Sequence, residues 1–160
     1  MRCFLAIPCP ESVRSPLRTV RDDLAETTDL RPVEAEQFHL TVKFLGDADQ
    51  DDIERLDQVF QSRLPTPGLL QLELRGVGVF PHPGSASVAW AGIEPTDDLR
   101  TLHETVEAVT VDLGYDEDHH DFRPHVTLGR FDDDGPPKAR IVRWIQEHGE
   151  TEFATFEASN

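Results

Sequence analysis

Two short stretches of the chain carry the same pair of polar side chains at the same spacing. His39 and Thr41 lie in the stretch FHLTVKFLG, and His125 and Thr127 lie in the stretch PHVTLGR. Histidine is the side chain whose ordinary pKa lies closest to neutrality, so it can accept or donate a proton at physiological pH. Two imidazoles around one small substrate group supply a general base and a general acid together. The repeated pattern therefore favours acid/base catalysis at one shared site.

The residue types around these histidines indicate displacement at phosphorus. The sequence contains no paired-cysteine metal motif and no nucleophile motif. In a displacement at phosphorus, one imidazole takes a proton from water and the other gives a proton to the departing oxygen. The threonine hydroxyls can bind non-bridging phosphate oxygens, and fixed donors stabilise the negative charge that develops on those oxygens.

Both stretches are predicted to be β-strands, because they are rich in β-branched and aromatic residues and contain a terminal glycine. Side chains alternate along a strand, so His39 and Thr41 share one face while Leu40 and Val42 point the other way. The second stretch has the same alternation. A single histidine-x-threonine triplet is most often a buried structural histidine, but two copies at matching places favour the catalytic interpretation.

The hydrophobic pattern predicts the same series of elements twice. Strands are expected over residues 2–7, 38–46, 70–80, 85–93, 124–130 and 153–157, and apolar helical stripes over 13–24, 53–64, 99–113 and 141–145. Each half has the order strand, helix, histidine strand, helix, strand, which indicates an internal duplication. We therefore predict an α+β class: one bilobal domain over residues 1–160, with two antiparallel sheets facing a central cleft and helices on the outside.

The charge of the chain limits which partners it can have. Its formal net charge is −16 over 160 residues, and Lys43 and Lys138 are its only lysines. Such a self-repelling surface stays soluble in concentrated salt, where screening is strong, so we interpret it as halophile-like. General coating of nucleic acid needs a basic surface and is excluded. Any contact with RNA must be local, near one end or one phosphate.

Hydropathy indicates a protein without membrane contact. No stretch approaches the roughly 18 consecutive apolar residues that a membrane span needs. The apolar run near the N-terminus is interrupted by Pro8 and Pro10 and is too short for a signal peptide. We expect a cytoplasmic monomer.

The two histidine stretches resemble the two-histidine phosphoesterase superfamily, and within it the RNA 2′,3′-cyclic phosphodiesterase branch, also called the LigT-like or 2′-5′ RNA ligase family. The opening MRCFLAI and the later GVGVFP are similar to the opening strand and a middle segment of that family. The resemblance implies a bilobal fold and opening of a terminal 2′,3′-cyclic phosphate on RNA, tRNA fragments included. It implies a 2′-phosphate product, no metal or other cofactor, and a reversible 2′-5′ ligation.

The resemblance also implies roles for individual residues. His39 would be the general acid that protonates the departing 3′ oxygen, and His125 the base that activates water, with the roles exchanged in the reverse reaction. Thr41, Thr127 and Arg130 would bind phosphate.

Strand alternation predicts the orientations of three further residues, which are Phe44, Arg130 and Lys43. Phe44 matches a family aromatic residue that stacks on the terminal base. Strict alternation, however, points Phe44 and Arg130 away from the histidines unless a β-bulge turns them back. Lys43 has the parity of the histidines, so a substrate-binding lysine and a solvated charge both remain open. The family normally continues with another strand after residues 153–160, and this sequence does not.

Three other interpretations compete with this one. His119, His120, Asp121 and His125 form a cluster of metal-ligand types, but neighbours on an irregular loop rarely converge on one ion, so we expect no metal. The chain could bind a nucleotide or an RNA end without turning it over. It could also hydrolyse a small cyclic nucleotide, which the acidic surface favours over a long RNA.

Overall fold

The computed structural model describes residues 2–63, 70–117, 122–132, 136–149 and 152–158. In chain order the elements are β1 (Arg2–Pro8), α1 (Glu11–Thr27), β2 (Arg31–Pro32), the 3-10 turn η1 (Ala35–Gln37), β3 (His39–Asp47), α2 (Gln50–Arg63), β4 (Leu70–Phe80), η2 (Pro83–Ser85), β5 (Val88–Ile93), α3 (Asp97–Asp112), β6 (His125–Arg130), α4 (Lys138–His148) and β7 (Glu152–Ala158). The α+β class and the duplicated order of the main elements are confirmed.

The seven strands of the described residues form one antiparallel sheet. Their order is β1-β3-β6-β5-β4-β7, and β2 pairs with the outer part of β6. We predicted two separate sheets. The strands are instead continuous, because the histidine strands β3 and β6 pair with each other through Leu40 and Val126. The two halves of the sequence are also interleaved, because β4 of the first half pairs with β5 and β7 of the second half. The two histidine-x-threonine motifs therefore lie side by side in neighbouring strands.

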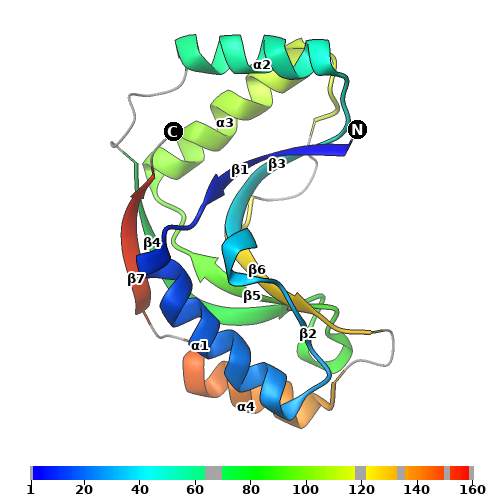
Figure 1. Cartoon of the computed structure of the whole chain (residues 1–160), viewed down its shortest axis with the longest axis vertical. Coiled ribbons are helices and arrows are strands. Elements are labelled where there is room, and N and C mark those ends of the chain that lie inside the picture. Colours follow the sequence, from blue (N-terminus) through cyan, green and yellow to red (C-terminus); the bar gives the residue numbers. More distant parts are fainter. Residues whose placement is uncertain (1, 64–69, 118–121, 133–135, 150–151, 159–160) are drawn as a thin grey trace.

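The helices lie in two pairs at opposite ends of the curved sheet (Figure 1). Helices α2 and α3 contact each other at one end, and α1 and α4 contact each other at the other end. Helix α3 packs on β3, whereas α1 packs on β7 and α4 packs on β4. This arrangement gives the molecule two lobes.

Apolar stripes attach these helices to the sheet. Helix α1 buries the four residues of its predicted stripe, which are Val13, Leu17, Val20 and Leu24. Burying such side chains contributes roughly 1.5–3 kcal/mol each. Trp144 of α4 is also buried, and its indole nitrogen donates a 3.2 Å hydrogen bond to the carbonyl of Val20. Of the stripe expected over 53–64, Leu56 is buried, while residue 64 lies outside the described residues.

Within the described ranges, none of the helices combines the length and the apolarity that crossing a bilayer requires.

Candidate active site

The two histidine-x-threonine triplets lie side by side in the sheet. Their middle residues, Leu40 and Val126, are direct partners in the antiparallel pair β3 and β6. With this register each histidine is opposite the threonine of the other triplet, and the two histidines are diagonal neighbours. Leu40 and Val126 are 1% and 0% exposed, so they point into the core. The opposite side, which we call the histidine face, carries His39, Thr41, His125 and Thr127.

Both imidazoles are held in the same way. Nδ1 of His39 lies 2.6 Å from the carbonyl oxygen of Gln37, and Nδ1 of His125 lies 2.7 Å from the carbonyl oxygen of Arg123. A carbonyl oxygen can only accept, so Nδ1 is the donor in each pair and carries a hydrogen. Proton exchange is therefore directed to Nε2 of each ring. A ring held in this way can work as a base when neutral and as an acid when protonated.

The backbone that supplies these carbonyls is itself fixed by the neighbouring strands. The residue before each histidine accepts a hydrogen bond from the end of the adjacent strand: Cys9 N–H donates to Phe38 over 3.0 Å, and Ile93 N–H donates to Pro124 over 3.1 Å. The two halves thus use matching local structure to orient their histidines.

Strand β3 contains a β-bulge directly after its threonine. Leu5 and Ala6 are consecutive in β1 and pair with Lys43 and Thr41, so Val42 is an additional residue in β3. Consecutive residues of β1 belong to opposite faces, and so do their partners. The alternation is therefore reversed after Thr41, and Lys43 no longer shares the histidine face.

The reversal exchanges the predicted orientations of two residues. Phe44 joins the histidine face, and 72% of this residue is exposed. Lys43 is neither on the histidine face nor in solvent, so both of its predicted positions are wrong. It is 4% exposed on the back of β3, where its Nζ lies 3.1 Å from Oε1 of Glu107 and donates to the carbonyl of Asp116 over 2.9 Å.

Strand β6 contains the same kind of bulge at the corresponding place. Consecutive residues 89–90 of β5 pair with Gly129 and Thr127, so Leu128 is the additional residue. The alternation is again reversed, and Arg130 lies on the same face as Thr127. Arg130 is exposed. The bulge needed to bring Phe44 and Arg130 to the histidines is thus present in both strands.

Two aromatic residues beside His125 were not predicted as part of the site. The ring of Phe80 meets the imidazole edge to face at 5.2 Å, and the indole of Trp90 lies 6.3 Å from it. A Cβ atom on Gly78 would lie 2.2 Å from the indole, so only glycine leaves room for Trp90 at this position. The alternation of glycine with valine in β4 was the available sign that a neighbouring ring covers this strand.

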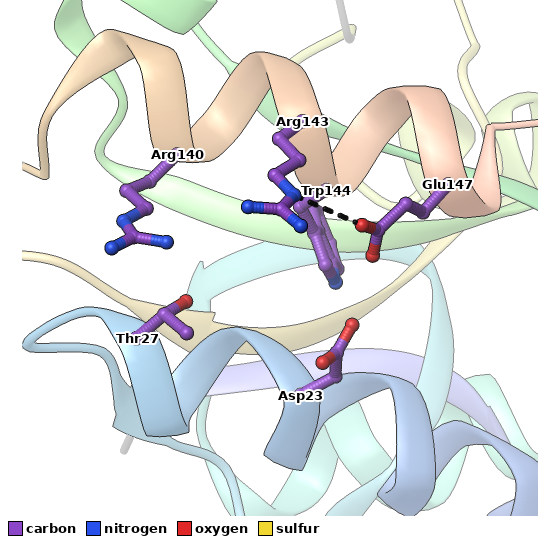
Figure 2. A pocket seen from close by; sticks show the side chains of 6 residues that line it. All are labelled: Asp23, Thr27, Arg140, Arg143, Trp144 and Glu147. Carbon is purple, nitrogen blue, oxygen red and sulfur yellow. Dashed lines mark hydrogen bonds and ion pairs between the residues drawn. The ribbon is translucent and has the colours of Figure 1, made fainter.

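Three residues of the cluster that the sequence offered as a rival metal site, His119, His120 and Asp121, lie outside the described residues. Among the described residues, Asp23, Glu147 and His148 form a group of metal-ligand types, in which His148 Nε2 lies 2.9 Å from Asp23 Oδ2. This group borders a hollow of about 300 Å³ between α1 and α4 (Figure 2), away from the histidine strands. The hollow is lined by Asp23, Thr27, Arg140, Arg143, Trp144 and Glu147.

Comparison with known proteins gives a consistent result. Residues 8–159 match the model of the 2′-5′ RNA ligase superfamily. The chain is similar to a protein of Archaeoglobus fulgidus named RNA 2′,3′-cyclic phosphodiesterase, with 31% identity over 158 residues, 98% of this chain and 88% of the relative.

Solved structures with the same arrangement are also found. A structure from Thermus thermophilus superimposes with a TM-score of 0.80 at 25% identity, covering 99% of this chain and 84% of that one. Escherichia coli LigT complexed with 3′-AMP has a TM-score of 0.70 at 23% identity and covers 98% of this chain and 83% of LigT, which supports the fold alone.

Proposed function

Because the chain belongs to the 2′-5′ RNA ligase superfamily, we propose that it is an RNA 2′,3′-cyclic phosphodiesterase that opens a terminal cyclic phosphate to a 2′-phosphate. Relatives from Archaeoglobus fulgidus and Aeropyrum pernix, each 31% identical to this chain over the aligned residues, bear the name of that activity. The reverse reaction would be a 2′-5′ ligation. Cytoplasmic location and a monomeric state stay predictions from the sequence.

The observation that carries the proposal is the matched pair of carbonyl bonds to Nδ1 of His39 and His125. These bonds present two equivalent proton-exchanging nitrogens on one face of the sheet. Hydrolysis of a cyclic phosphate needs one proton removed from water and one delivered to the departing oxygen, so it uses one such nitrogen for each transfer.

In the proposed reaction, neutral His125 takes a proton from water through Nε2 while the water oxygen forms a new bond to phosphorus. The bond between phosphorus and the 3′ oxygen breaks, and protonated His39 gives its Nε2 proton to that oxygen. His125 leaves the step protonated and His39 leaves it neutral, and exchange with solvent restores both. The reverse reaction exchanges the two roles.

The neighbouring side chains fit the charge of this reaction. Thr41 and Thr127 stand beside the histidines and would donate hydrogen bonds to the non-bridging phosphate oxygens. Arg130 would add a positive charge at the same phosphate, since the bulge in β6 brings it to the histidine face. Phe44, which is largely exposed, would stack on the terminal base.

A small cyclic nucleotide is the second candidate substrate. It is favoured by the net charge of −16, which repels a long polyanion. Arg130 and Phe44 would contact one phosphate and one base, and a mononucleotide offers both.

The test is hydrolysis of an oligoribonucleotide that ends in a 2′,3′-cyclic phosphate, with the product phosphate located by NMR. We expect a 2′-phosphate, and a rate that is unaffected by a chelator. His39→Ala and His125→Ala should each lower kcat by about 10²–10⁴-fold. His82→Ala, at the exposed N-cap of the η2 turn, is the matched control and should leave the rate unchanged.

Each alternative gives a different result. A 3′-phosphate product would contradict the assignment of His39 as the acid. Binding of the cyclic end without turnover would identify a binding module, and full activity in either histidine variant would overturn the mechanism. A higher kcat/KM for 2′,3′-cyclic AMP than for the oligonucleotide would select the small substrate.

A further inference from the structure

A buried ionic cluster lies behind the first histidine strand. The Lys43 side chain is 3% exposed and the Glu107 side chain of α3 is 16% exposed, and Nζ of Lys43 lies 3.1 Å from Oε1 of Glu107. Lys43 also donates to the carbonyl of Asp116. Lys43 thereby connects β3 both to α3 and to Asp116, which follows α3 in the chain.

Helix α3 also contacts Phe122, shortly before β6 begins. His103, one turn before Glu107, stacks on Phe122 with ring centroids 4.0 Å apart and ring planes 5° apart. Nε2 of His103 lies 3.9 Å from Oε1 of Glu107, which is too far for a hydrogen bond, so the stacked ring adjoins the cluster without bonding to it. Phe122 directly precedes Arg123, whose carbonyl accepts from Nδ1 of His125.

We propose that His103 is a positioning residue for His125, with Lys43 and Glu107 supporting it from behind. The stack on Phe122 holds the chain directly before Arg123, and the Arg123 carbonyl keeps the hydrogen of His125 on Nδ1. The effect on catalysis rests on the proposed function, in which neutral His125 acts as the base through an unprotonated Nε2. The effect on the ring itself does not depend on any substrate.

The two histidines differ in this respect. The carbonyl partner of His39 belongs to Gln37, which closes the η1 turn through its own N–H bond to Glu34. The acceptor of His39 is fixed within its own turn, whereas the acceptor of His125 is held both by the strand contact at Pro124 and by the stack from α3. His39 is therefore an internal control for any change at His103.

The experiment compares His103→Ala, which removes the stack, with His103→Phe, which keeps a flat ring against Phe122. Ring ¹⁵N shifts of the 160-residue chain are recorded at about pH 8, where an unperturbed imidazole is neutral. In His103→Ala we expect the Nδ1 and Nε2 shifts of His125 to converge as both tautomers become populated. The shifts of His39 should not change, and His103→Phe should resemble the wild type.

Hydrolysis gives the second measurement. We expect His103→Ala to lower kcat about tenfold with KM within about twofold, because the ring is misplaced while the phosphate contacts stay intact. His103→Phe should restore kcat. Wild-type shifts for His125 in folded His103→Ala, or an equal change in His39, would overturn the proposal. If His103→Ala fails to fold, Phe122→Leu removes the same stack and the same two outcomes apply.

The ring shifts are measured without substrate. A protein that lacks phosphodiesterase activity but shows the expected shifts would contradict the proposed function and leave the positioning role of His103 supported.

Discussion

Leu40 of β3 and Val126 of β6 are direct partners where the two histidine strands pair. Both are buried, and each is the middle residue of a histidine-x-threonine triplet. The apolar pair therefore fixes how the two polar faces meet, with each histidine opposite the other triplet's threonine. A one-residue slip in this pairing would turn one triplet away from the other. The site depends on a core contact as much as on its polar residues.

Replacing Phe44 by alanine should weaken the use of substrates that present a base. Stacking of a base on an aromatic ring contributes about 1–3 kcal/mol, so kcat/KM for a cyclic-ended oligonucleotide should fall about 5–150-fold. Val111→Ala is the matched control, since Val111 is the other large hydrophobic residue that is exposed among the described ones. Equal kcat/KM values for the two variants would mean that Phe44 does not contact the base.

Replacing Arg130 by glutamine should act on the phosphate. A charged hydrogen bond to phosphate contributes about 1.5–3 kcal/mol, so kcat/KM should fall about 10–150-fold. The loss should be the same for an oligonucleotide and for a cyclic mononucleotide, because both carry the reacting phosphate. Arg100→Gln, at an exposed position of α3, should leave steady-state kinetics unchanged. A loss confined to the oligonucleotide would place Arg130 elsewhere on the RNA.

The sequence predicts the strands, the duplicated order and the shared face of each histidine with its threonine, because these follow from local periodicity. It does not predict the positions of Lys43, Phe44 and Arg130. Their orientation is decided by the bulges, and a bulge is a property of the pairing with β1 or β5 rather than of the bulged strand alone. The packing of Phe80 and Trp90 on His125 likewise combines three strands that only the fold brings together.

Gly78→Ala should destabilise the protein and disturb the site together. A Cβ atom there would lie 2.2 Å from the Trp90 ring, so the indole must move. Such overpacking costs about 1–3 kcal/mol, which should lower the midpoint of urea unfolding, and the shifted indole should reduce kcat through its contact with His125. Gly84→Ala, in the exposed η2 turn, meets no atom closer than 3.3 Å and should be nearly neutral. Wild-type stability in Gly78→Ala would contradict this packing.

Cys9 should resist thiol reagents in the folded protein. Burial raises the pKa of its thiol from 9.0 to about 11, with a smaller opposing effect from Arg14. In a Cys3→Ser background, labelling by a disulfide reagent at about pH 8 should be slow and should become fast in urea. Fast labelling of the folded variant would show that Cys9 is accessible.

The same shift has a consequence for stability. A raised pKa means that the folded state holds the proton more tightly than the unfolded state. The stability contributed by Cys9 is therefore complete below about pH 9 and lost as the pH rises through about 11. Cys9→Ala should lack this part of the alkaline decrease in unfolding free energy.

Salt should stabilise the protein. A net charge of −16 makes the folded surface self-repelling, and salt screens that repulsion. Raising KCl from about 0.1 M to about 2 M should increase Tm by more than about 5 °C, as measured by calorimetry. The neutralising variants Asp97→Asn and Asp98→Asn, on the first turn of α3, should reduce the increase. A Tm that falls with salt would contradict the halophile-like interpretation.

The two bulges have a consequence for how such an enzyme can diversify. Each bulge adds one residue directly after the threonine. The side chain three positions after that threonine therefore lies on the histidine face. Position 44 holds a ring and position 130 holds a cation, although the triplets before them are alike. In the proposed reaction, a substitution at position 44 would change the contact with the base and one at position 130 the contact with the phosphate, while both imidazoles keep their orientation.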